Sequence, residues 1–219
     1  MEAATIKLII ISIVPVLFAI VVHEVAHGWV AKLRGDQTAY LMGRLTLNPF
    51  KHIDPVGTVL VPLVMIAMLG FAFGWAKPVP VDWRNLRSPR RDMVLVAAAG
   101  PGSNFVMALG WGVIMSLAIY FAPGLGSFAA PLALMAKVGV LINVVLMVFN
   151  LIPLPPLDGG RVAVGLLPPA LADPLSRLEP FGMILILVLL ATGLLGKILW
   201  PFVSVVAQFV LSLTGSGMS

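Results

Sequence analysis

Long apolar runs constrain this chain more than any other feature of its sequence. A helix needs about 20 predominantly apolar residues to cross a bilayer. Only 11% of the 219 residues are charged, against roughly a quarter in a typical soluble domain. The sequence therefore predicts an all-α polytopic membrane protein with five to six membrane-embedded helical segments. These segments cover about residues 5–33, 56–74, 93–122, 132–152, 181–195 and 198–213.

The same scarcity of charge leaves no room for a sizeable soluble domain, so we expect one membrane domain over residues 1–219. Within it, a core covers about residues 5–165 and C-terminal helices cover about residues 180–214. The first run resembles a signal peptide but has no convincing small-residue cleavage site, which predicts an uncleaved helix. The chain contains no cysteine, so any metal ion must be bound by His, Asp, Glu or water.

Basic residues are concentrated in two stretches, 32–55 and 75–92, whereas residues 123–131 carry no charge. Lys and Arg in membrane proteins collect on cytoplasmic loops, so the net charge of +5 does not point to a nucleic-acid partner. If both stretches are cytoplasmic, the run 56–74 must enter and leave the membrane on one side as a re-entrant segment. The alternative is an ordinary span that leaves one basic loop outside.

A short stretch before this run has the alternation of a β-strand. Residues 43–47 read Gly-Arg-Leu-Thr-Leu and are followed by Asn48-Pro49, a pattern typical of a strand with its terminating turn. The sequence therefore predicts a short β-ribbon near residues 38–48. At membrane depth such a strand must pair with protein or line a cavity.

The segment His23-Glu24-Val25-Ala26-His27 carries the clearest chemical pattern. Residues i and i+4 lie on the same face of a helix, so His23 and His27 can bind one tetrahedral metal ion while Glu24 meets a bound water. A polar patch at a helix end is the alternative. Three ionisable groups on an apolar helix cost several kcal/mol unless they are paired or metallated, which favours the metal site.

A catalytic zinc site has three protein ligands and one open position, so a third ligand is needed. His52 lies in a polar basic stretch, where a loop role is expected. Asp158 follows an apolar run in a segment that cannot be helical, and broken backbone at membrane depth is tolerated where it is buried or lines a polar cavity. We therefore predict Asp158 as the third ligand, with a simple Asp-Gly turn as the alternative. The prolines that break this segment are Pro153, Pro155 and Pro156.

Three motifs occur in order: residues 23–27, the Gly-Pro-Gly-Ser-Asn segment 100–104, and the segment from Asn150 to Gly159. Together they resemble the site-2 protease family of intramembrane zinc metalloproteases, in its compact bacterial and archaeal form without a PDZ or CBS domain. The resemblance covers residues 23–161. For Asn104, which ends the second motif, we expect a role in capping or bridging helices.

The resemblance implies a role for each matching position. One Zn²⁺ per chain would be bound by His23, His27 and Asp158. Glu24 would be the general base, and Asn150 would help to hold the substrate or an oxyanion.

The resemblance also implies a function: hydrolysis of a peptide bond in or near the transmembrane helix of a membrane-anchored substrate, in regulated intramembrane proteolysis. The expected partners are a transmembrane protein or peptide and the lipid bilayer. The expected location is the cytoplasmic (inner) cell membrane, as a multi-pass protein whose site opens toward the cytoplasm. In the family, a β-ribbon beside the first motif helps to present the substrate, which agrees with the strand expected near residues 38–48.

Two other functions fit parts of the pattern. A metal-binding membrane transporter would use the same ligands in transit, but it would be expected to stage several ligand groups along a pore. A non-proteolytic membrane adaptor would have no need for Glu24.

Overall fold

The computed structural model describes residues 3–69 and 74–216. Four stretches in this part of the chain are long and apolar enough to cross a membrane, and α8 with α9, bent by 66°, makes a possible fifth span. The prediction of an all-α polytopic membrane protein is confirmed. The long helices are α1 (Ala3–Arg34), α4 (Pro89–Tyr120), α6 (Ala129–Asn150) and α10 (Leu194–Leu213), and the bent pair is α8 (Pro169–Ser176) with α9 (Glu179–Ala191).

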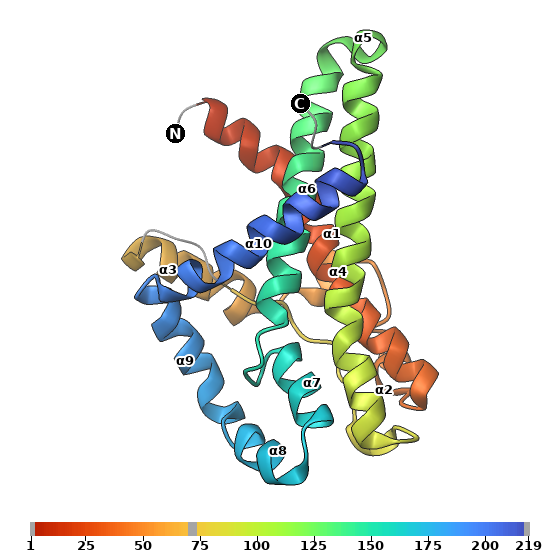
Figure 1. Ribbon diagram of the computed structural model, residues 1–219, viewed down its shortest axis with the longest axis vertical. Helices are drawn as coiled ribbons and strands as arrows, with labels where there is room; N and C mark the ends of the chain where they lie inside the picture. The colour runs from red at the N-terminus through yellow and green to blue at the C-terminus, as the bar shows by residue number, and fades with distance from the viewer. Residues whose placement is uncertain (1–2, 70–73, 217–219) are drawn as a thin grey trace.

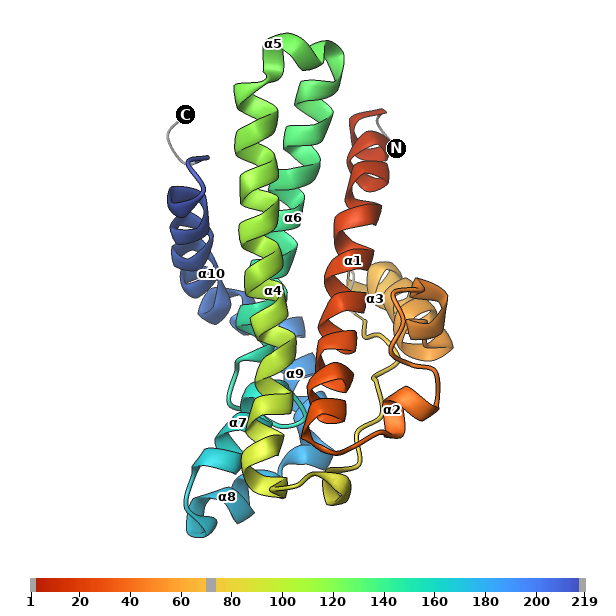
Figure 2. The same ribbon diagram turned by 90° about the vertical axis from the view of Figure 1, so that its right-hand side faces the viewer.

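Helices α1, α4 and α6 form the centre of the molecule (Figure 2). Helix α4 runs antiparallel to α6, and the two are joined by α5 (Ala122–Leu125) and the short helix η4 (Gly126–Phe128). Helix α10 crosses α6 obliquely (Figure 1). Small and β-branched side chains fill the space between these helices, which lets the backbones approach closely. The buried residues are Ala108, Val140, Val144, Val203 and Val210.

Helix α6 ends at Asn150 because proline lacks an N–H and its ring clashes with the preceding turn. Residues 151–157 form an irregular turn, after which α7 (Asp158–Leu166) begins. Helix α7 packs against α4, and α9 approaches the turn so closely that a Cβ at Gly182 would overlap the carbonyl of Pro155. The later part of the turn, at Pro155 and Leu157, is therefore buried against protein, as broken backbone at membrane depth must be.

The apolar run 56–74 does not cross the molecule. Its described part forms the π-helical turn η2 (Pro55–Leu60) and α3 (Val61–Leu69). Trp75 N–H donates to the Gly57 carbonyl at 3.0 Å, and the Thr58 hydroxyl donates to the Trp75 carbonyl at 2.9 Å. An ordinary span would separate its two ends by about 30 Å. The segment instead returns to its starting point, as a re-entrant segment does.

The prediction of a β-ribbon near residues 38–48 is wrong. Residues Thr38–Leu41 form the short helix α2, the chain turns at Gly43 with a φ of +63°, and no strand occurs in residues 3–69 or 74–216. The Arg44 side chain points inward and donates to the carbonyls of Lys77 and Pro78 at 2.9 and 3.3 Å. The Arg44 side chain therefore occupies the carbonyl groups with which a neighbouring strand would form backbone hydrogen bonds, so the two segments do not pair as strands.

Both basic stretches reach the same end of the bundle. Helix α1 ends and α4 begins there, close to α8, whereas α5 lies at the opposite end (Figure 2). The Arg87 N–H donates to the Arg34 carbonyl at 3.0 Å, which joins the two stretches directly. The end with α5 carries no charged residue between positions 121 and 131. The bundle is thus strongly polarised along its length.

Candidate metal centre

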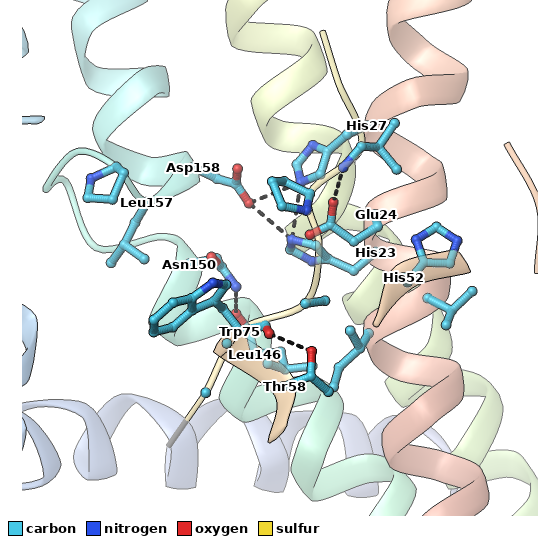
Figure 3. A pocket seen from close by; sticks show the side chains of 18 of the residues that line it. His23, Glu24, His27, His52, Thr58, Trp75, Leu146, Asn150, Leu157 and Asp158 are labelled. Atoms are coloured by element: carbon cyan, nitrogen blue, oxygen red, sulfur yellow. Dashed lines mark hydrogen bonds and ion pairs between the residues drawn. The ribbon is translucent and has the colours of Figure 1, made fainter. Parts of the chain in front are cut away.

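Three predicted ligands, two on α1 and one at the first residue of α7, lie together in the interior (Figure 3). The Nε2 atoms of His23 and His27 are 3.1 Å apart, and each lies 3.3 Å from Asp158 Oδ2. One helical turn separates the two histidines, so their rings project from the same face of α1. The prolines that end α6 bring Asp158 back to meet them.

Hydrogen bonds on the far side of each ring orient the two histidines. His23 Nδ1 lies 2.6 Å from Asn104 Oδ1, and His27 Nδ1 lies 2.7 Å from the Val96 carbonyl. Both partners are oxygens on α4, so each Nδ1 carries the proton. Each Nε2 then presents a lone pair toward Asp158.

The donor set fits a zinc ion. Asp158 Oδ2 is fully buried and accepts no hydrogen bond, and it faces the Nε2 atoms of both histidines. Three electron-rich atoms this close, with no proton between them, repel one another unless a cation lies among them. Two imidazoles and one carboxylate match the ligand set of catalytic zinc sites, which keep a fourth position open.

Helix α4 can approach this cluster only because residue 100 is glycine. A Cβ on Gly100 would overlap His27 Nε2 and would lie 2.6 Å from His23 Cε1. Gly100 belongs to the Gly-Pro motif found in the sequence. The motif thus provides space for the two imidazoles, and four residues later it provides the amide of Asn104 that binds His23.

Residues 75–82, which we call the strap, cross over Glu24 in an extended conformation. Val79 N–H donates to Glu24 Oε2 at 2.8 Å, and the Val79 side chain is buried. Two hydrogen bonds hold the strap in place. The Lys77 N–H donates to the His52 carbonyl at 2.9 Å. At the end of the strap, the Asp82 N–H donates to Asp36 Oδ2 at 2.9 Å. It therefore holds one oxygen of the Glu24 carboxylate in a defined position.

A cavity of about 640 Å³ connects these groups. Its wall includes the three clustered ligands, Glu24, the strap, and apolar side chains from α1, α6 and α9. Asn150, at the end of α6, also lines the cavity and donates to the Leu146 carbonyl at 3.0 Å (Figure 3). Asn150 is therefore close to the cluster, and its role in binding substrate stays a prediction.

Four other polar residues have roles that the sequence predicts for some of them and not for others. These residues are Arg44, His52, Asn104 and Asn143. His52 ends the short helix η1 (Pro49–His52), its Nε2 bonds the Thr46 carbonyl at 2.9 Å, and it is not part of the ligand cluster. Asn104 bridges helices, as expected. Sequence reasoning missed Arg44 and Asn143, and the only available signal for Asn143 was a single amide within an apolar run.

The fold and the site together define a class: a multi-pass membrane protein with a buried metal-binding cluster beside a glutamate, the arrangement of an intramembrane metalloprotease. Comparison with known proteins leads to the same class. The model of peptidase family M50 matches residues 123–193. No solved structure matches the chain.

Two relatives cover most of the chain. It is 39% identical over 202 residues to a Bacillus subtilis protein named "Putative zinc metalloprotease YwhC", covering 92% of this chain and 89% of that one. It is 29% identical over 188 residues to "Putative zinc metalloprotease Rip2" of Mycolicibacterium smegmatis, covering 85% of this chain and 68% of that one. The chain therefore belongs to peptidase family M50, the site-2 protease family.

Proposed function

We propose that this protein is a zinc-dependent endopeptidase that hydrolyses a peptide bond in or near the transmembrane helix of a membrane-anchored substrate. One observation carries the proposal. Three potential ligand atoms from α1 and α7, the Nε2 atoms of His23 and His27 and Oδ2 of Asp158, converge within 3.3 Å of one another, beside Glu24 and inside a bundle of membrane-spanning helices. Membership of family M50 and the names of the relatives support zinc and proteolysis.

In this proposal His23, His27 and Asp158 hold the zinc ion. When bound, zinc polarises the scissile carbonyl and lowers the pKa of a bound water to about 7. The bonds from Asn104 and Val96 keep both imidazoles in the tautomer that can bind a metal. Such partners typically account for 10–100-fold in metal affinity or activity.

Glu24 is the proposed general base. Val79 N–H engages Oε2, so Oε1 is the oxygen available to take a proton from the attacking water. Glu24 then delivers that proton to the leaving amine. Asn150 lines the same cavity and would support the oxyanion or the substrate backbone through its side-chain amide.

The substrate must be unwound locally, because a helix hides its carbonyl groups in i to i−4 hydrogen bonds. In lipid, each backbone group released from these bonds costs several kcal/mol unless it finds a partner. The extended strap lies along the cavity, so we place the unwound substrate segment beside it rather than beside residues 43–47. Apolar walls from α1, α6 and α9 suit the flanking side chains of a transmembrane segment.

The charge distribution supports a location in the cytoplasmic membrane with the site open to the cytoplasm. The end of the bundle that carries both basic stretches is the end expected on the cytoplasmic side. The strap, whose outer end reaches Asp36 just beyond α1, connects the cavity to that end of the bundle. Water would reach Glu24 from the same side.

The test combines zinc content with cleavage of a single-pass model substrate in detergent or liposomes. Wild-type protein should contain one zinc per chain and cleave the substrate. Glu24→Gln should keep zinc and lose turnover, because the amide cannot take up a proton. Asp158→Ala should lose both.

Matched controls carry the same chemical changes away from the site. Glu179→Gln and Asp173→Ala alter exposed residues near α8 and α9 and should retain zinc and activity. Cleavage by Glu24→Gln, or full zinc occupancy in Asp158→Ala, would contradict the assignment.

A further inference from the structure

Two buried asparagines connect the metal cluster to helix α6. Asn104 on α4 and Asn143 on α6 have no exposed surface. Asn104 Nδ2 donates to Asn143 Oδ1 at 2.9 Å, and Asn104 Oδ1 lies 2.6 Å from His23 Nδ1. A chain of side-chain amides thus runs from α6 through α4 to α1.

Two backbone carbonyls fix the direction of every bond in this chain. Asn143 Nδ2 lies 2.8 Å from the Gly139 carbonyl, which can only accept a hydrogen bond. The nitrogen of Asn143 must face that carbonyl, so its oxygen must face Asn104. Asn104 then has to present its nitrogen to Asn143 and to a second acceptor, the Ala19 carbonyl, at 3.3 Å.

The orientation of Asn104 decides the protonation of the His23 ring. With its nitrogen committed to Asn143 and Ala19, Asn104 can offer only an oxygen to His23. The proton of the neutral ring must therefore sit on Nδ1, which leaves a lone pair on Nε2. With the amide of Asn104 reversed, the proton would sit on Nε2, where it would block metal binding.

We propose that Asn143 is a positioning residue of the metal site, which acts through Asn104 to hold His23 in the tautomer that binds zinc. This inference rests on the proposed zinc site and extends it to a residue that touches no ligand. Buried polar chains of this kind are costly unless every member is satisfied. Here the two carbonyls satisfy both amides and set their direction.

The tautomers can be measured directly in zinc-free protein. The chain has three histidines, and their ¹⁵N shifts at about pH 9, above the ordinary imidazole pKa of about 6.5, report which nitrogens carry a proton. We expect Nδ1–H for His23 and His27 and Nε2–H for His52, which bonds the Thr46 carbonyl through Nε2. Nε2–H on His23 in the wild-type protein would overturn the proposal without any substitution.

Zinc affinity, measured by competition with a chelator, tests the route of action. Asn104→Leu should weaken binding about 10–100-fold, in the range typical for loss of a partner behind a metal ligand, and Asn143→Leu should weaken it by a smaller factor. The double variant should bind as Asn104→Leu does, because Asn143 has no other path to His23. Asn143→Asp, which still accepts from Asn104, should bind near the wild-type level.

A control separates this role from packing. Val140→Ala removes buried volume on α6 without touching the amides, so it should lower the thermal stability of the zinc-free protein and leave zinc affinity unchanged. If Asn143→Leu behaves like Val140→Ala, Asn143 is only structural. If the fold-losses of zinc affinity caused by Asn104→Leu and Asn143→Leu multiply in the double variant, Asn143 does not act through Asn104. Absence of zinc binding in wild-type protein would instead refute the proposed function.

Discussion

Gly100 shows at the scale of one residue how closely the helices approach the metal cluster. Its hydrogen occupies the space where any side chain would meet both imidazoles. Two residues further along the same helix, Gly102 has no atom within 4 Å of a Cβ position. Substitution of Gly102 is therefore a matched control for substitution of Gly100, because only Gly100 lies against the site.

Gly100→Ala should weaken zinc binding. Overpacking by one methyl group typically costs about 1–3 kcal/mol, and 1.4 kcal/mol is tenfold in affinity, so we expect a loss of about 5- to 150-fold in zinc competition assays. Gly102→Ala should leave zinc affinity unchanged and raise thermal stability slightly, because Ala favours a helix more than Gly does. Equal zinc affinity in both variants would show that the imidazoles have room to move.

Asp36 is a second residue whose environment sets its behaviour. Its carboxylate accepts from the N–H of Thr38 and Asp82 and from the amide of Asn85. Burial alone would raise the pKa of Asp36, but these bonds and the Thr38 hydroxyl outweigh it and place the pKa below its ordinary value. The carboxylate thus fastens the outer end of the strap to the loop after α1.

The linkage of this pKa to stability has a definite sign. A carboxyl whose pKa is lower in the folded state stabilises the protein above its unfolded pKa of about 3.9 and loses that contribution as pH falls through the folded value. Asp36→Asn should therefore lower the free energy of unfolding at pH 7 by about 1–3 kcal/mol, because buried donors lose their acceptor. The midpoint of thermal unfolding should fall with it. The difference from wild type should narrow below about pH 4. The exposed Asp173→Asn should show no such pattern.

At the scale of elements, helices and broken segments differ in how well the sequence predicts them. The long helices are predicted to within a few residues, because an apolar run and its flanking charges are local signals. The return of residues 56–74 is also predictable, because both flanks are basic. The alternation at residues 43–47 gives a wrong prediction, because five alternating residues do not reveal whether a neighbouring strand exists.

Sequence order carries little information on long-range side-chain contacts. The clustering of the side chains at 23, 27 and 158 is predictable, because their chemistry is unusual in an apolar chain. The strap over Glu24 depends on Arg44 reaching the carbonyl groups of residues 77 and 78, more than 30 positions away. Such contacts form only when the packed fold brings the elements together.

The return of the 56–74 segment predicts the side of the membrane on which its flanks lie. The protein has no cysteine, so single cysteines can be labelled in cells with a maleimide that does not cross the membrane. Lys51→Cys and Lys77→Cys, both at exposed positions, should be protected in intact cells and react after lysis. Gly124→Cys, in the loop at the other end of the bundle, should react in intact cells. If only one of Lys51→Cys and Lys77→Cys reacted in intact cells, the segment between them would span the membrane.

At the scale of the whole molecule, the metal cluster connects distant parts of the chain. Helix α1 contributes two of the clustered side chains, and α7 contributes the third from beyond the α4–α6 hairpin. Without a cation, the three facing ligand atoms repel one another. A bound ion should therefore stabilise the packing of α7 against the centre of the bundle.

Removal of zinc with a chelator should lower the midpoint of thermal unfolding, and added zinc should restore it. At free zinc of 100 times its Kd the stabilisation is about 2.7 kcal/mol, which differential scanning fluorimetry can detect. Glu24→Gln should respond as wild type does, and Asp158→Ala should not respond. A zinc-dependent shift in the Asp158 variant would place the ion elsewhere.

The split origin of the cluster also has a consequence for biosynthesis. A chain is made from its N-terminus, so both histidines and Glu24 are inserted in the membrane long before Asp158 leaves the ribosome. A nascent chain that ends at α6 offers two of the three clustered ligands. On the proposed assignment, the third ligand is added only when α7 docks against α4. A newly made chain would then cleave no neighbouring membrane protein until its own assembly is nearly complete.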